Sequence, residues 1–147
     1  MNLEDGIKYT SLLIERAKNK ILIYDGHFDP KLYQNEQVVR TIKYAISRGV
    51  KVQVVCDKRA EILNDELAGM IEKKAIDVFR KDLNYGLLSM VFSSRHRDKG
   101  HFMVVDSMHT REEEPHKIES YNRGAHIILF SEDAGKLVNR FYMLRDF

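Results

Sequence analysis

Apolar, β-rich segments alternate with amphipathic segments through the first 80 residues, and this alternation limits the possible folds more than any other feature. The apolar segments are ILIYD (21–25), VKVQVVCD (50–57) and AIDVFR (75–80). Each is preceded by apolar residues at helical spacing, over 3–18, over a segment ending at Gly49, and over 59–73. This order is typical of a parallel sheet covered by helices. We therefore expect an α/β fold with a mixed, mostly parallel sheet and helices on both faces.

The second half of the chain has a different pattern. LNYGLLSMVFSS (83–94) fits either a short helix or a strand, and HFMVVDSM (101–108) reads as a strand. TREEEP (110–115) reads as a charged turn or loop, while 116–121 and 125–130 read as antiparallel strands. Ser131 is expected to cap a last helix, with Glu132 and Asp133 in its first turn.

Length and composition favour one domain over residues 1–147 and exclude a strongly basic nucleic-acid binder. The net charge is only +2, so binding of nucleic acid requires a local basic patch. SSRHRDKGH (93–101) is the one concentrated basic stretch, and a solvated loop is the alternative interpretation. The single cysteine fits a reducing compartment, and the sequence shows neither a signal-peptide pattern nor a membrane-spanning apolar run. We expect a cytoplasmic protein without a membrane segment.

The motif that carries chemistry begins at Lys99. Lys99 and His101 are two apart at the start of an apolar run that ends in Asp106, so on a strand they share a face. The chain resembles the phospholipase D-like superfamily in its opening (KNKILIYDGHFDP, then RGVKVQVVCD) and in its closing GAHIILF plus helix. That family's motif is His, any residue, Lys, four residues, Asp. Here the basic pair is reversed, and ESYN (119–122) is similar to the family's Gly-Ser-x-Asn element.

The resemblance implies a phosphodiester chemistry that requires no metal or other cofactor. One histidine attacks phosphorus and forms a phosphohistidine, and a second protonates the leaving oxygen. Lys, Ser and Asn hold the phosphoryl oxygens. A chain with one motif supplies one half of such a site, so the resemblance implies a homodimer. The catalytic candidates are His101, Lys99, Asp106 and Glu119, and the phosphate-binding candidates are Ser120, Asn122 and His27.

The reversed pair leaves the activity open. Exchanging Lys99 and His101 moves the imidazole by two residues, roughly 6–7 Å along a strand, and in-line attack tolerates far less. One hypothesis is a homodimer that acts on a phosphodiester, with nucleic acid as the preferred substrate. The other is a non-catalytic module that binds phosphate or nucleic acid, or serves as a scaffold. A doubly wound signalling domain has only Asp25 and Asp57 in its favour.

Overall fold

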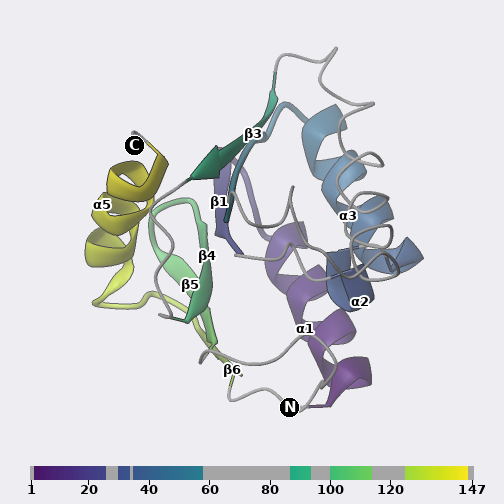
Figure 1. Ribbon diagram of the computed structural model, residues 1–147. Helices are drawn as coiled ribbons and strands as arrows, with labels where there is room; N and C mark the ends of the chain where they lie inside the picture. Colours follow the sequence, from purple (N-terminus) through teal and green to yellow (C-terminus); the bar gives the residue numbers. More distant parts are fainter. Residues whose placement is uncertain are drawn as a thin grey trace, which may run out of the picture.

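The computed structural model describes residues 2–25, 30–33, 35–57, 87–93, 100–113 and 125–145. These residues form a six-stranded sheet with the order β3-β2-β1-β4-β5-β6 (Figure 1). The strands are β1 (Lys20–Tyr24), β2 (Lys51–Asp57), β3 (Leu88–Ser93), β4 (His101–Val105), β5 (His109–Glu113) and β6 (Ala125–Ile128). The helices are α1 (Leu3–Glu15), α2 (Pro30–Tyr33), α3 (Glu36–Ser47) and α5 (Ala134–Arg145).

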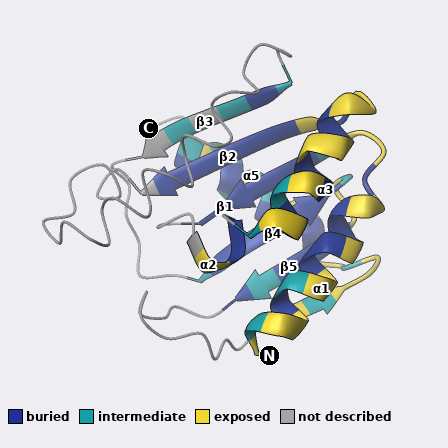
Figure 2. Ribbon diagram, turned by 90° about the vertical axis from the view of Figure 1, so that its right-hand side faces the viewer, coloured by how far each residue is buried: buried dark blue, intermediate teal, exposed yellow. Residues whose placement is uncertain are grey.

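Helices cover both faces of the sheet, as expected. α1, α2 and α3 lie on one side, and α5 lies on the other (Figure 1). The core beneath the three helices includes alternate residues of the two central strands, which are Ile21, Ile23, Met103 and Val105. The core beneath α5 includes the residues between them, with one from the helix, and these are Leu22, Phe102, Val104 and Phe141. Both central strands are therefore buried on both faces (Figure 2).

Local sequence signals set the ends of the helices. The Asn2 side chain accepts a hydrogen bond of 2.8 Å from the backbone N–H of Asp5 and caps α1. Asn35 caps α3 in the same way, with its side chain accepting from two backbone amides. Beyond the end of α3, Gly49 has a φ of +90°, which a residue without a Cβ adopts readily. The predicted helix end at Gly49 is confirmed.

The pairing corrects the expected balance of the sheet. The parallel strands come from the first half, where β1 pairs with β2 and β2 pairs with β3. The pairs β1–β4, β4–β5 and β5–β6 are antiparallel. Among the described strands the sheet is therefore mixed but mostly antiparallel. A tight turn through 106–108 returns the chain beside β4, which a two-stranded antiparallel ladder permits.

Two local predictions were wrong. Most of TREEEP, predicted as a loop, is strand β5, because the ladder with β4 outweighs the low strand propensity of a charged segment. Glu132 and Asp133 precede α5 rather than forming its first turn. Ser131 does accept from the Asp133 N–H at 3.2 Å. The predicted helix 59–73 and the predicted strands 75–80 and 116–121 lie outside the described residues.

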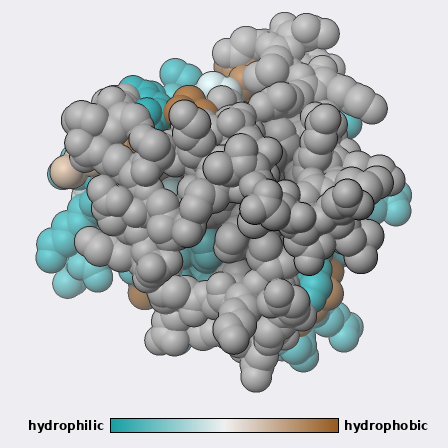
Figure 3. Space-filling view, viewed as in Figure 1, coloured by the Kyte–Doolittle hydropathy of each residue, from teal (hydrophilic) through white to brown (hydrophobic). Residues whose placement is uncertain are grey.

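The outer surface of α5 is polar apart from Met143, which is 60% exposed. Lys136 and Asn139 are exposed on this helix, and Figure 3 shows hydrophilic side chains on that side of the molecule, at the left. Across the described ranges, no helix combines the length and the apolar character that crossing a bilayer requires.

Candidate functional site

His101 lies at the first position of β4, on the face of the sheet that α1, α2 and α3 cover. Its side chain shares that face with Met103 and Val105, two and four residues further on. The register Ile23↔Met103 places Asp25, directly after β1, opposite His101. The antiparallel pairing thus brings together two residues that are 76 positions apart in the sequence.

The two side chains form a buried pair. Nδ1 of His101 lies 3.5 Å from Oδ1 of Asp25, and the side chains are 10% and 2% exposed. The Asp25 backbone is fixed by its N–H, which donates to the Val55 carbonyl at 3.2 Å. A carboxylate beside Nδ1 orients the imidazole. This is the relation of an orienting acid to a catalytic histidine.

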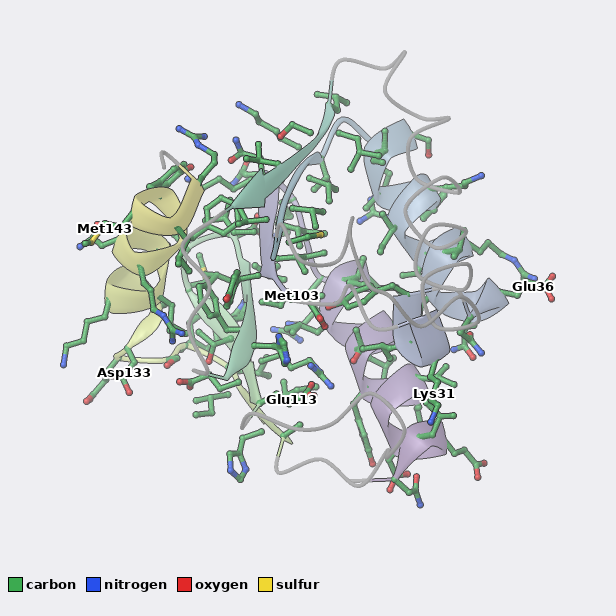
Figure 4. All side chains as sticks on the ribbon, in the orientation of Figure 1. Lys31, Glu36, Met103, Glu113, Asp133 and Met143 are labelled. Carbon is green, nitrogen blue, oxygen red and sulfur yellow. The ribbon has the colours of Figure 1, made fainter. Side chains whose placement is uncertain are left out.

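A buried ion pair on β5 lies beside this pair. Glu113 is opposite His101, and Arg111 is opposite Met103. Arg111 Nη1 donates to Glu113 Oε2 at 2.7 Å, with side chains only 1% and 3% exposed. Figure 4 shows Glu113 and Met103 between the sheet and the layer of α1 and α2. We call Asp25, His101, Arg111 and Glu113 the polar cluster.

Asp106 belongs to a different part of the molecule. Its carboxylate accepts hydrogen bonds of 2.8–2.9 Å from three consecutive backbone amides, those of Lys18, Asn19 and Lys20. It follows the end of β4, five residues from His101, so the two Cα atoms are about 16 Å apart along the strand. The structure does not bring Asp106 and His101 together. The carboxylate instead ties the connection between α1 and β1 to the turn between β4 and β5.

Most of the other predicted site residues lie outside the described residues. These are Lys99, Glu119, Ser120, Asn122 and His27. Their convergence with His101 stays a prediction. Within the described ranges, no group of three His, Cys, Asp or Glu side chains is placed to hold a metal ion.

Arg140 of α5 reaches the same end of β4 from the opposite face. Its guanidinium lies 5.1 Å from the ring centre of Phe102 and 5.8 Å from that of Tyr24. Nη2 donates to the Gly100 carbonyl at 3.4 Å. Burial lowers the pKa of Arg140 from its usual value, although a guanidinium stays protonated at any physiological pH. Arg140 therefore fixes the backbone immediately before His101.

Sequence reasoning missed Arg111, Glu113 and Arg140 as members of this region. The first two are two residues apart, as side chains on one face of a strand must be. That signal was present in TREEEP. Arg140 gave no such signal, because its neighbours come from strands far away in the sequence.

The comparison with known proteins rests on structure. No protein-family model matches the sequence, and no curated protein matches it. Nuc from Salmonella typhimurium, a phospholipase D family member, superposes with a TM-score of 0.64 at 16% identity, over 95% of this chain and 86% of its own. NucT from Helicobacter pylori gives 0.64 at 14% identity, over 98% and 89%.

A third similar structure is TrmBL2, an archaeal chromatin protein that shows a novel mode of DNA binding. It superposes with a TM-score of 0.63 at 16% identity over 97% of this chain. The chain spans only 49% of the length of TrmBL2. At 14–16% identity these similarities concern the fold. The chain has the phospholipase D-like fold.

Proposed function

We propose that the protein acts as a homodimer on a phosphodiester of nucleic acid and cleaves it without a metal, with His101 as the reacting imidazole. The observation that carries the proposal is the buried pair of His101 and Asp25 at one end of the two central strands. Support comes from the shared fold with Nuc, a phospholipase D family member, and with TrmBL2, which binds DNA. The cytoplasm, with its reducing conditions, is the proposed location.

The pair suits nucleophilic catalysis. Asp25 faces Nδ1 and so orients Nε2 of His101 for attack on phosphorus, which forms a P–N bond as the bond to the leaving oxygen breaks. The imidazole of a second copy donates its proton to that oxygen. The same imidazole then takes a proton from water, whose oxygen attacks phosphorus and breaks the P–N bond. The distance of 3.5 Å is long for a hydrogen bond, as is common before substrate binds.

The remaining motif residues have supporting roles in this proposal. Lys99, Ser120, Asn122 and His27 would hold the phosphoryl oxygens, whose charge grows in the transition state. Glu119 would orient an imidazole. Arg140 would act as a positioning residue, because it contacts the Gly100 carbonyl and not the reacting atoms.

A second candidate function is binding of phosphate or nucleic acid, or a scaffold role, without catalysis. The observation that favours it is burial, because His101 is only 8% exposed and its acid is 2% exposed. The reversed motif order also shifts the imidazole from the position that the family pattern gives it. Binding requires only charge and hydrogen-bond donors near an anion, whereas catalysis requires in-line geometry.

A phosphodiesterase assay in EDTA separates the two functions. The substrates are bis(p-nitrophenyl) phosphate and a labelled single-stranded oligonucleotide. We expect His101→Ala to lower kcat/KM by roughly 10⁴-fold and Asp25→Asn by roughly 10²-fold, since the first removes the nucleophile and the second only its orienting charge. His126→Ala is the matched control, because His126 is an exposed histidine on β6. Wild-type protein that binds the oligonucleotide but does not cleave it would establish the second function.

A further inference from the structure

The outer face of α1 carries a row of four exposed residues that the fold itself does not require. Asp5, Tyr9, Leu12 and Arg16 are four, three and four positions apart, so they lie along one side of the helix. Figure 2 shows this side of α1 as exposed. Tyr9 is 43% and Leu12 is 47% exposed. We call these four residues the α1 stripe.

The α1 stripe has the symmetry of a two-fold contact. Asp5 and Arg16 are equally far from the midpoint of the stripe, and so are Tyr9 and Leu12. If a second α1 lies antiparallel on the first, each carboxylate meets a guanidinium and each Tyr9 meets a Leu12. An isologous interface requires this kind of self-complementary surface. Antiparallel helices also place opposite ends of their dipoles side by side.

Intrachain effects account for the charges but not for the apolar pair. An acid near the start of a helix and a base near its end stabilise any helix through its dipole. Within the chain, Tyr9 has Lys8 Nζ 5.4 Å from its ring centre, but 43% of Tyr9 and 47% of Leu12 stay exposed to water. Leu12 also borders a groove of about 560 Å³ between α1 and β6, together with Ile127 and Leu129. The groove widens the apolar area beyond the helix.

Exposed residues beside the C-terminal half of α1 extend this surface. Leu129 is 46% and Phe130 is 71% exposed. Phe130 and Arg16 also border a second groove of about 660 Å³. A two-fold axis through the middle of α1 would place these side chains against the N-terminal half of the second helix. The interface then includes residues outside the two helices, and its buried area comes closer to the ~800 Å² per partner of a stable interface.

We propose that a second copy of this chain docks on the α1 stripe, with the two α1 helices antiparallel. The contact goes beyond the proposed function, because the stripe lies on the solvent side of α1 and the polar cluster lies on the sheet beneath the helix layer. A dimer through α1 and a dimer at His101 use different surfaces. Where their two-fold axes cross at right angles the two contacts give a closed tetramer, and otherwise they give an open chain of dimers.

Charge reversal tests the pairing with a measurable prediction for each variant. In Asp5→Arg, two arginines face each other twice per dimer, and in Arg16→Asp, two aspartates do so. Each single variant should self-associate at least about tenfold more weakly than wild type, since one substitution alters two contacts. Sedimentation or light scattering should show the mass halve at concentrations where wild type is associated.

Two further samples should restore the association. The double variant Asp5→Arg/Arg16→Asp again pairs opposite charges, although both changes oppose the helix dipole and lower its stability. A mixture of the two single variants should form a heterodimer with two complementary pairs. If the double variant recovers the mass of wild type although its α1 is less stable, better folding of α1 cannot be the cause.

Exposed charges elsewhere serve as controls. Glu132→Arg and Lys136→Glu make the same changes of net charge near and on α5 and should leave the mass unchanged. The proposal is overturned if wild type is a monomer throughout a 100-fold range of concentrations that extends to the highest soluble one. It is equally overturned if the single variants keep the mass of wild type. It is also overturned if the controls reduce the mass equally. Loss of phosphodiesterase activity with the mass unchanged bears on the site at His101 alone.

Discussion

The two ends of β4 carry ionisable side chains from the same motif, yet they are built for different purposes. At the far end, Asp106 accepts hydrogen bonds from three consecutive backbone amides. At the near end, the His101 imidazole lies against the carboxylate of Asp25, an acid from the neighbouring strand. One carboxylate is bound to the main chain, and the other is bound to a side chain that can exchange a proton. The first arrangement stabilises the fold, and the second suits chemistry.

The contrast explains the spacing of the motif. Four apolar residues separate His101 from Asp106, and they are the rest of strand β4. The length of β4 therefore fixes the distance between the basic residue and the aspartate. The spacing of the motif is therefore explained by strand β4, which pairs with β1. The acid beside the imidazole is Asp25, which the motif does not contain.

The largest expected change in stability is at the near end, in the buried ion pair. Glu113→Ala removes the carboxylate that Arg111 donates to at 2.7 Å, in a place where both side chains are at least 97% buried. Breaking one member of such a pair costs about 3–5 kcal/mol in the free energy of unfolding. Urea denaturation followed by circular dichroism measures it.

A double variant shows whether charge or volume is responsible. Arg111→Met/Glu113→Leu keeps apolar volume and removes both charges, so it should recover most of the lost stability. If the double variant is as unstable as Glu113→Ala, hydrogen bonding to other groups, rather than the pair itself, sets the stability of this end.

Asp106→Ala should have the next largest effect, at the far end. It removes three charge-assisted hydrogen bonds, two of them in exposed surroundings, so we expect a loss of about 2–4 kcal/mol. Asp106→Asn should lose only about 1 kcal/mol, because an amide oxygen still accepts and Asn tolerates positive φ. The φ of Asp106 is +54°. Thermal and urea unfolding measure both.

The control for this prediction is Asp133→Ala. Asp133 is exposed, and its ion pair with Lys136 spans 3.9 Å, so its removal should change stability by less than about 0.5 kcal/mol. Equal losses from Asp106→Ala and Asp133→Ala would contradict the role assigned to the far end.

Arg140→Ala should have a smaller effect, again at the near end. The change removes the guanidinium that lies over Phe102 and Tyr24 and its hydrogen bond to the Gly100 carbonyl. We expect a loss of about 1–2 kcal/mol in the free energy of unfolding. Arg140→Met keeps the packing of the side-chain stem and should lose less. Indistinguishable losses from the two variants would mean that the packing of the stem contributes nothing, and an Arg140→Met variant as stable as wild type would mean that the cation contributes nothing.

The sequence was sufficient for the part of the fold that depends on local pattern. Apolar runs predicted β1, β2 and β4. The helical spacing of apolar residues before Gly49 predicted α3, whose buried face includes Val38, Ile42, Ala45 and Ile46. It failed at β5, since the charges of Arg111 and Glu113 resemble those of a solvated loop. Their burial depends on the turn at 106–108 and on pairing with β4, which a local pattern does not contain.

The candidate site was predictable only in half. The motif identified His101 because strand spacing and residue type are local properties. Its acid, Asp25, depends on the register of β1 against β4, which is a long-range property. Asp106 was assigned to the site for the opposite reason: it is close in the sequence but lies at the other end of the strand. The predictions for Lys99, Ser120 and Asn122 concern residues outside the described part of the chain.

The smallest expected effect is the pH dependence that His109 gives to the far end. Nδ1 of His109 accepts a hydrogen bond of 3.1 Å from the Phe130 N–H, and the two rings contact each other edge to face at 4.8 Å. A protonated imidazole has no lone pair to accept that bond. Burial lowers the pKa of His109 from 6.5, the nearby charge of Arg16 lowers it further, and Asp106 raises it.

The sign of the effect follows from the lowered pKa of His109. Between its folded value and 6.5 the unfolded chain binds more protons, so the stability that His109 contributes is complete above pH 6.5 and is lost as the pH falls through this window. His109 is buried beside the second groove, and the charge of Asp106 opposes the lowering of its pKa, so the loss should stay below about 1 kcal/mol. Wild type and His109→Gln are compared by urea unfolding at pH 7.5 and pH 5.5. The variant should lose less stability on acidification, since its amide does not titrate and the two proteins have the same residues at all other positions. An equal or larger loss in the variant would show that protonation of His109 does not weaken this end of the sheet.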